Sequence, residues 1–343
     1  MKKFFAMTVV GLLLTCCGCE AVQSRQVQRI QNTDTVMGTV IQQTLYTTDS
    51  ETAAAQEITG LLRELEEKEL SRRLGTSEIW TLNEAAGRAE GSGLSASMEK
   101  ILTGCLEMWQ KSEGAFDVTL GPVVSLWDID GWASGEREGT FELPGEEQLA
   151  DALEKCGSAG LIISDGRLYL PAGMQLDLGA VGKGIGLDRI LAYLQEKNEI
   201  TGAVISLGGS VLIYGQKPDG QCWNVGIANP ADTASNVGVL TLEGEWFIST
   251  SGDYERYAEL EGIRYHHIID PFTGYPADSG VAGVTILTKD GFLSDALSTA
   301  CFILGEEKGM ALAESCGAEV LFVGKDGSIT MSEGMKTYYR SGK

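Results

Sequence analysis

LYLPAGMQLDLGAVGKGIGLDRILAYLQEK (residues 168–197) is the stretch that decides the fold class. It starts with an apolar run, continues with four glycines between positions 179 and 186, and ends in leucine and isoleucine at helical spacing. The pattern predicts a strand, a glycine-rich turn and a helix. GAVISLGGSVLIYG (residues 202–215) comes soon after and predicts two strands joined at a Gly-Gly pair. Strands that adjoin strands through such short turns favour an α+β fold over a doubly wound parallel sheet.

The rest of the chain continues this arrangement, with helices between groups of strands. Residues 281–305 predict a strand, an Asp-Gly turn and a helix. Further strands are predicted at 36–46, 237–244 and 244–252, and further helices at 50–70, 95–111 and 146–155. We therefore expect one large α+β domain at 34–335, with mixed or antiparallel sheets and helices packed on them, followed by a tail at 336–343.

The composition is that of a globular and strongly acidic protein. Hydrophobic residues make up 43% of the 343 residues and charged residues 22%, as in chains with a sizeable buried core. Lysine and arginine number 26 against 48 aspartates and glutamates, a formal net charge of −22. A surface this acidic repels polyanions, which argues against nucleic acid as a partner. An anionic ligand therefore needs local backbone amides, a few cations or a metal ion.

The N-terminus predicts export and lipid attachment. MKKFFAMTVVGLLLTCCGC (residues 1–19) has two lysines, an apolar run too short to span a bilayer, and then small residues and cysteines. It resembles a bacterial lipoprotein signal, in which the first mature cysteine receives lipid. Cys17 and Cys19 both fit that position, and an ordinary cleaved secretory signal is the alternative. Polar residues 20–33 suit a tether, so we expect a protein anchored through lipid to the extracytoplasmic face of the cell membrane.

The glycine-rich junction at 176–186 has features of an anion-binding site. Closely spaced glycines let backbone amides approach an anion, and the helix N-terminus favours negative charge there. Lys183 can neutralise a phosphate. The spacing is neither that of a Walker loop nor the GxGxxG of dinucleotide-binding folds. A tight strand–helix turn without any ligand explains the glycines equally well.

SDALSTA (residues 294–300) offers oxygen ligands on one face of a predicted helix. Asp295 and Thr299 are four residues apart and therefore lie one turn apart on the same side. A carboxylate and a hydroxyl form part of a shell for Mg²⁺, which prefers oxygen ligands. The alternative is a structural helix start, with Ser294 as the cap and Asp295 near the positive end of the helix dipole.

The only two histidines stand side by side in YHHIIDPFTGYP (residues 265–276). The Asp-Pro and Thr-Gly pairs that follow predict a firm turn, which would fix the preceding strand end. A histidine held there can act as a general base near neutral pH. The chain has no third histidine and no HExxH motif, so a zinc site is not indicated.

Two further stretches have the composition of pocket walls. STSGDYER (residues 249–256) combines small hydroxyl residues with a glycine, which suits close contact with a ligand but also an ordinary turn. FDVTLGPVVSLWDID (residues 116–130) places Asp117 between aromatic residues. Aromatic residues beside polar groups can line a pocket for a flat ring, although packing in a core is their more common role.

Together these stretches resemble the FAD:protein FMN transferase family, the ApbE-like flavin transferases. The matching motifs run in family order through residues 34–335: Met37-Gly38-Thr39, Ala115-Phe116-Asp117, Leu176-Asp177-Leu178-Gly179 with Gly182-Lys183-Gly184, Ser249-Thr250-Ser251-Gly252, His267-Ile268-Ile269-Asp270-Pro271 with Thr273-Gly274, and Asp295-Ala296-Leu297-Ser298-Thr299. The resemblance implies an ApbE-like α+β fold related to the T-fold. It also implies a Mg²⁺-dependent reaction that moves FMN from FAD to a threonine hydroxyl of an acceptor protein and releases AMP.

The resemblance further implies roles for single residues. His267 would be the catalytic proton acceptor. Contacts to FAD would come from Met37, Ala115, Phe116, Asp117, Asp177, Lys183 and Ile269, and ligands to Mg²⁺ from Ala180 through its carbonyl, Asp295, Ser298 and Thr299. The acceptor would be a flavin-carrying electron-transfer subunit or an extracellular reductase.

The chain departs from the family pattern at a place that bears on function. LSRRLGTSEIW (residues 70–80) has Arg72 and Arg73 where the family often has an aromatic residue. An FAD pyrophosphatase that uses water as the acceptor is therefore one alternative. A lipid-anchored flavin-binding or solute-binding protein without chemistry is another, and the presence of Asp295, Thr299 and His267 together argues against it.

Overall fold

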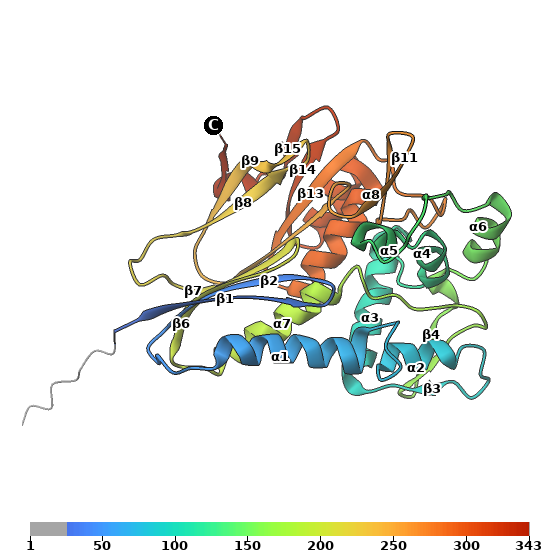
Figure 1. The fold of residues 1–343 in the computed structure, drawn as a ribbon, viewed down its shortest axis with the longest axis horizontal. Coiled ribbons are helices and arrows are strands. Elements are labelled where there is room, and N and C mark those ends of the chain that lie inside the picture. Colours follow the sequence, from blue (N-terminus) through green and yellow to red (C-terminus); the bar gives the residue numbers. More distant parts are fainter. Residues whose placement is uncertain (1–25, 343) are drawn as a thin grey trace, which may run out of the picture.

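The computed structural model describes residues 26–342. The signal expected at 1–19 and the first residues of the expected tether lie outside this range. The described chain forms a single α+β domain around one large sheet, which confirms the predicted fold class (Figure 1). In this part of the chain, no helix combines the length and the apolar character that crossing a membrane requires.

An eight-stranded antiparallel sheet forms the centre of the fold, in the order β1-β2-β6-β7-β10-β13-β14-β15. Its strands are β1 (Gln28–Val36), β2 (Thr39–Thr47), β6 (Ile200–Leu207), β7 (Ser210–Gly215), β10 (Trp246–Gly252), β13 (Val281–Thr288), β14 (Glu319–Gly324) and β15 (Ile329–Met331). The strand pair expected around Gly208 and Gly209 is β6–β7, with Leu207 opposite Ser210. Short turns between strands thus give the neighbouring pairs that the sequence predicted.

The strand predicted at 36–46 is confirmed from Thr39 on as β2, but its first residues contain the turn of a hairpin. β1 and β2 pair in register and are joined by Met37 and Gly38. The φ angles of these two residues are 52° and 66°, as in the two-residue turns that match the twist of paired strands. Residues 28–33, which we expected in the tether, belong to β1 and therefore to the sheet.

Helices cover one face of this sheet, and Figure 1 shows α1 and α7 running beneath it. α1 (Ala54–Leu65) continues into a single π-helical turn, η1 (Glu66–Leu70), so the helix expected at 50–70 is largely confirmed. Ile58 of α1 and Leu187 of α7 (Gly182–Gln195) pack in one core cluster with Leu212 and Phe247 of the sheet. α8 (Gly291–Ser315) packs beside them on β10 and β13.

A small second sheet covers the opposite face, in the order β16-β9-β8. Its strands are β8 (Trp223–Asn229), β9 (Asp232–Leu242) and β16 (Tyr339–Ser341). Trp223 and Leu240 pack against Ile213 and Ile248, which alternate with the sheet residues that face the helices. Residues expected to be a tail after position 335 instead complete α9 (Met335–Tyr338) and β16, whose Tyr339 lies opposite Leu240.

The remaining elements form the part of the molecule beside α8. They are α2 (Glu78–Glu84), β3 (Ser92–Gly93), α3 (Ala96–Lys111), α4 (Gly121–Trp127), α5 (Ile129–Ser134), α6 (Glu146–Leu153), η2 (Ser158–Gly160), β4 (Ile162–Ser164), β5 (Arg167–Tyr169), β11 (Tyr257–Leu260) and β12 (Ile263–His266). The helices predicted at 95–111 and 146–155 are confirmed as α3 and α6. Ser95 caps α3 by accepting a hydrogen bond from the Met98 N–H.

α7 and α8 meet through glycines, and this contact positions the starts of both helices. A Cβ added to Gly184 would lie 2.1 Å from the carbonyl oxygen of Gly291, and one added to Gly186 would lie 2.6 Å from Leu62. At Gly184 only glycine permits such an approach, because the Cβ of any other residue would overlap the Gly291 backbone, whereas at Gly186 the Leu62 side chain of α1 would have to move. These two glycines of the predicted turn therefore lie within α7 and allow helix packing.

Candidate functional site

One cavity brings together residues from most of the motifs that the sequence analysis identified. Its walls come from the segments before α4 and α7, the end of β10 with the loop after it, the segment after β12, and α8. Every expected site residue except Met37 and Asp295 lines this cavity: Ala115, Phe116, Asp117, Asp177, Ala180, Lys183, His267, Ile269, Ser298 and Thr299.

A second, larger cavity adjoins the first, and Met37 lies in its wall. This cavity extends to β8, and it shares with the first cavity the side chains of Lys183, Thr250 and Glu255, among others. Its volume is about 1160 Å³, against about 130 Å³ for the first cavity. Lys183, Thr250 and Glu255 therefore lie where the two cavities adjoin.

The two adjacent histidines have opposite environments. His266 is 4% exposed, its Nε2 lies 3.0 Å from the carbonyl oxygen of Ala277, and its Nδ1 accepts a hydrogen bond from the Ile268 N–H at 3.3 Å. His267 lines the cavity, and its Nδ1 lies 3.2 Å from the carbonyl oxygen of Arg256. A carbonyl oxygen can only accept, so this Nδ1 carries the proton and Nε2 is left as the acceptor. His266 is therefore structural, and His267 is the histidine available for chemistry.

Both imidazoles are held in the neutral form. Burial lowers the pKa of His266 to about 4. Burial, together with the positive charges of Arg256 and Lys183, lowers the pKa of His267 well below its ordinary value. A neutral imidazole with an accepting nitrogen is the form that acts as a general base.

Asp295 holds the start of α8 against α7 and the main sheet. Its Oδ2 accepts a hydrogen bond from the Gly184 N–H at 2.6 Å, and its Oδ1 accepts from the hydroxyls of Ser210 and Ser249 at 2.7 and 2.6 Å. Asp295 is 3% exposed. It takes part in none of the ion pairs between described residues. Only neutral dipoles therefore compensate this buried acid.

The oxygen atoms near Asp295 suit a hard cation. Ser298 and Thr299 follow one turn later on α8 and line the cavity together with Ala180. Residues 26–342 contain no cluster of three or more His, Cys, Asp or Glu side chains with metal-site geometry. A cation here would therefore have one carboxylate and otherwise neutral oxygens, and Mg²⁺ commonly leaves its other positions to water and substrate phosphates.

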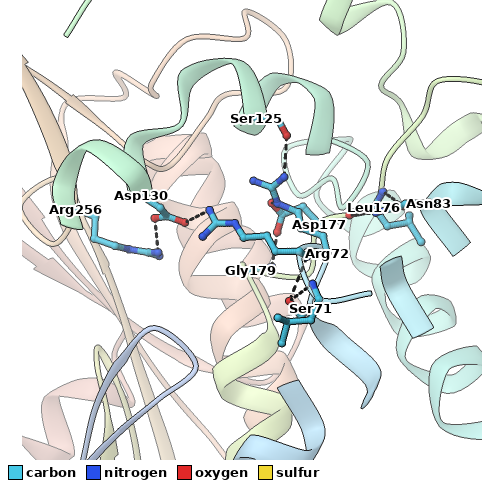
Figure 2. Close-up of polar contacts among 11 residues, drawn as sticks. Ser71, Arg72, Asn83, Ser125, Asp130, Leu176, Asp177, Gly179 and Arg256 are labelled. Atoms are coloured by element: carbon cyan, nitrogen blue, oxygen red, sulfur yellow. Dashed lines mark hydrogen bonds and ion pairs between the residues drawn. The ribbon is translucent and has the colours of Figure 1, made fainter. Parts of the chain in front are cut away.

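Two carboxylates that the resemblance assigns to FAD also shape the loops of the cavity. Oδ1 of Asp117 accepts hydrogen bonds from the Thr119 N–H at 2.8 Å and from the Ser158 hydroxyl at 2.8 Å. Oδ2 of Asp177 pairs with Nε of Arg72 at 2.7 Å, as Figure 2 shows. Each carboxylate retains lone pairs, so these contacts are compatible with a role toward a ligand.

The predicted Asp-Pro turn is present and fixes the segment after His267. The Phe272 N–H donates to Oδ1 of Asp270 at 2.9 Å, and the Gly274 N–H donates to the Asp270 carbonyl at 2.8 Å. The indole N–H of Trp127 donates to the Gly274 carbonyl at 2.7 Å. Trp127 is thus a core residue that ties α4 to the turn, although its edge reaches the cavity.

Several charged residues of the cavity wall were not predicted. Glu255 and Arg256 come from STSGDYER, and Arg73 comes from the segment that departs from the family pattern. Arg256 donates to Oδ1 of Asp130 at 2.6 Å, and Arg73 donates to Oδ2 of the same carboxylate at 3.3 Å. Burial raises the pKa of Glu255, although the charges of Lys183 and Arg256 act in the opposite direction. The cavity wall therefore has positively and negatively charged side chains close together.

Comparison with known proteins agrees with the order of the motifs. Residues 37–322 match the sequence model of the ApbE family. The chain belongs to the ApbE family. A relative from Treponema pallidum, named FAD:protein FMN transferase, is 34% identical over 98% of this chain and 96% of its own length. A relative of the same name from Vibrio cholerae is 32% identical, again over 98% of this chain and 96% of its own length.

Solved structures of ApbE proteins share the fold. The ApbE protein of Thermotoga maritima has a TM-score of 0.81 at 29% identity, over 92% of this chain and 100% of that one. The flavin transferase ApbE of Vibrio cholerae has a TM-score of 0.79 at 29% identity, over 91% of this chain and 100% of that one. The ApbE-like fold expected from the sequence is therefore confirmed.

Proposed function

We propose that this ApbE-family protein transfers FMN from FAD to an acceptor protein. The observation that carries the proposal is the meeting of His267, Lys183 and Thr299 in one cavity. These residues supply a neutral base, a cation for phosphate and a hydroxyl on α8, one turn after the buried carboxylate of Asp295, which has no cationic partner among the described residues. The names of the relatives that match nearly the whole chain support the same activity.

The finer chemistry is phosphoryl transfer to a threonine. The hydroxyl oxygen of the acceptor threonine bonds to the phosphorus of the FMN half of FAD, and the bond from that phosphorus to the bridging oxygen breaks. AMP leaves with the bridging oxygen, and Nε2 of His267 takes the threonine proton. A positioned general base typically contributes about 10²–10⁴-fold to the rate. Lys183 binds the phosphates, which the acidic surface of the protein would otherwise repel.

Ala180, Asp295, Ser298 and Thr299 would hold Mg²⁺. Bound there, the ion supplies positive charge that stabilises the departing phosphate. The chain's own contribution is the carboxylate of Asp295, which Gly184, Ser210 and Ser249 hold in place. Oxygen donors in a rigid arrangement are the ligands that such an ion needs.

The two adjoining cavities give room for a dinucleotide. Pockets for drug-sized ligands commonly measure about 300–1,000 Å³. The cavity beside His267, at about 130 Å³, is smaller, whereas its neighbour measures about 1160 Å³. We therefore place FAD along the two adjoining cavities, both of which have the Lys183 side chain in their walls.

The proposal is tested with the full-length chain, FAD, Mg²⁺ and an acceptor domain that carries the target threonine. The acceptor should gain covalent flavin fluorescence and the mass of FMN, and His267→Ala should abolish both. His266→Gln, which changes the neighbouring structural histidine, is the matched control and should retain the activity. An unlabelled acceptor, while the Vibrio cholerae relative labels its own acceptor in the same assay, would contradict the proposal.

The same assay addresses hydrolysis. FMN and AMP released without acceptor, as fast as total FAD turnover with acceptor, would assign the protein as an FAD pyrophosphatase. The placement of Arg72 is relevant here, because its side chain pairs with Asp177, one of the residues expected to contact FAD. In the transferase reaction the threonine Oγ attacks in place of the water oxygen that attacks in hydrolysis. The same site residues would serve both reactions.

The location of the protein is a separate proposal that rests on the N-terminal sequence. Residues 1–19 have the charge, apolar run and cysteines of a lipoprotein signal. We propose attachment to the extracytoplasmic face of the cell membrane, where flavin-carrying electron-transfer subunits or extracellular reductases would be the acceptors. Metabolic labelling with a fatty-acid analogue should mark the wild-type protein, and labelling should be lost in either Cys17→Ala or Cys19→Ala. A wild-type protein without label would contradict lipid attachment.

A further inference from the structure

Asp130 joins two arginines at the boundary of the two cavities. Arg73 lies in the loop after η1, Asp130 in α5, and Arg256 in the loop between β10 and β11. The carboxylate of Asp130 accepts from Arg256 at 2.6 Å through Oδ1 and from Arg73 at 3.3 Å through Oδ2. Figure 2 shows the labelled side chains of Asp130 and Arg256 turned toward each other from different elements. One carboxylate thus holds two guanidinium groups from distant parts of the chain.

The neighbouring Arg72 has a different environment, which separates the roles of the two consecutive arginines. Its Nε pairs with Asp177 at 2.7 Å and its Nη1 donates to the Ser125 hydroxyl at 2.8 Å (Figure 2). Its side chain is 17% exposed, whereas that of Arg73 is 53% exposed. Arg72 therefore braces the loop before α7, and Arg73 remains accessible to a ligand.

The contacts of Asp130 are of a kind that a ligand can replace. Ion pairs between exposed side chains contribute little to stability, because water already solvates both charges. A guanidinium group binds phosphate oxygens in the same bidentate geometry as carboxylate oxygens, and phosphate carries more charge. Arg73, Arg256 and Lys183 all line both cavities, as do the acids Asp130 and Glu255. An anion that binds here must therefore compete with the protein's own carboxylates.

We infer that Arg73 and Arg256 form a phosphate-binding site for the pyrophosphate of a flavin dinucleotide, and that Asp130 occupies this site as an internal competitor until the substrate displaces it. The inference rests on the proposed function and deepens it, because it names the residues that distinguish a dinucleotide from a flavin without phosphate. No comparison assigns these residues a role, and Arg73 stands in the segment that departs from the family pattern.

The position of the pair suits this task. A dinucleotide that spans both cavities has its pyrophosphate near the shared wall, and Arg73, Arg256 and Lys183 all belong to that wall. Arg256 also contacts His267 through its backbone, since its carbonyl oxygen accepts from the His267 N–H at 3.1 Å. The segment that would hold the phosphate therefore also positions the proposed base.

Equilibrium binding to the full-length chain tests the inference without requiring catalysis. The probes are ADP and riboflavin, measured by calorimetry, for wild type, Arg73→Gln and Arg256→Gln. Each substitution should weaken ADP binding about tenfold, the effect of losing one charge-assisted contact. Riboflavin carries no phosphate, so its affinity should not change. Arg63→Gln is the matched control: Arg63 pairs with Asp34 at 2.8 Å, is similarly exposed at 52%, and lines neither of the two cavities.

Asp130→Asn provides a test in which the sign of the effect is decisive. Removing the competing charge should strengthen ADP binding several-fold, whereas a purely structural role for the Asp130 contacts predicts weaker binding. Asp34→Asn is the control and should leave the affinity unchanged. Wild-type affinity for ADP in both arginine variants, or weaker binding in Asp130→Asn, would overturn the inference alone. A wild-type chain that binds neither ADP nor FAD would overturn the proposed function as well.

Discussion

The backbone carbonyl oxygen of Arg256 lies 3.2 Å from Nδ1 of His267, and the guanidinium of the same residue helps to lower the pKa of that imidazole. Residue 256 therefore acts on the proposed base in two ways. The carbonyl fixes the tautomer, and the side-chain charge disfavours the imidazolium. A substitution changes only the second effect, because every residue has a backbone carbonyl.

Arg256→Gln should raise the pKa of His267. A positive charge near an imidazole lowers its pKa, so removing that charge moves the pKa upward, although burial and Lys183 still hold it below the ordinary value. The acid limb of the transfer rate at saturating FAD should then shift to higher pH. The chain has two histidines, so NMR titration of their ring protons resolves the effect directly. Arg63→Gln should leave the titration unchanged, and an unaltered His267 signal in Arg256→Gln would refute the electrostatic explanation.

His266 should make the fold less stable as the pH falls from about 6.5 to about 4. Burial lowers its pKa to about 4 in the folded chain, while the unfolded chain keeps the ordinary value. Between these two pH values the His266 imidazole binds a proton in the unfolded state but not in the folded state, so acid favours unfolding. The effect amounts to at most about 3 kcal/mol. Urea unfolding at pH 6.5 and pH 4.5 should show a smaller loss for His266→Gln than for wild type, and equal losses would contradict this account.

The elements that the sequence predicted well are those that local residues determine. Ser95 accepts from the Met98 N–H at the start of α3, and a single segment contains both the cap and the helix. The turn after His267 likewise depends on Asp270 and Gly274, four positions apart. The sequence prediction missed the turn at Met37 and Gly38, because methionine, which here has a positive φ of 52°, is not one of the residues that usually precede glycine in such turns. Tertiary contacts stabilise that conformation: Met37 lies close to Gly182 and Gly186 of α7.

The candidate site shows the same division. His267, Lys183 and Thr299 each belong to a short motif, and each motif on its own indicates the chemistry of its residue. The ion pairs of Asp130 join residues 57 and 126 positions away along the chain, and no local pattern indicates them. The two cavities were equally unpredictable, since their shared wall exists only when α5, α7 and the segment after β10 meet.

Gly184→Ala should destabilise the fold by about 2–4 kcal/mol. The new methyl group would lie 2.1 Å from the Gly291 carbonyl oxygen, and neither backbone can move without separating α7 from α8. Gly60→Ala is the control, because Gly60 lies in α1 with nothing within 4 Å of the added Cβ. It should stabilise the protein by up to about 1 kcal/mol through helix propensity. Denaturant unfolding measures both changes, and a Gly184→Ala protein as stable as wild type would contradict the close contact.

Asp295→Asn should remove the charge of a buried acid while the fold is kept. The amide oxygen can accept from the Gly184 N–H, and the amide nitrogen can donate to the hydroxyls of Ser210 and Ser249, which rotate to accept. Adding Mg²⁺ to ADP should therefore raise the melting temperature of wild type above the value with ADP alone, but should give no such further rise in the variant, because ligands stabilise only the state that binds them.

Asp188→Asn gives the opposite pattern and serves as the control for Asp295→Asn. The two carboxylate oxygens of Asp188 accept from the backbone N–H groups of Gly291 and Phe292, both at 2.8 Å. An amide nitrogen at either position would face a donor, which costs about 1–3 kcal/mol of stability. Asp188→Asn should therefore melt at a lower temperature yet keep the further rise that Mg²⁺ causes in the presence of ADP. An equal further rise in wild type, Asp188→Asn and Asp295→Asn would show that the Asp295 carboxylate does not hold the ion.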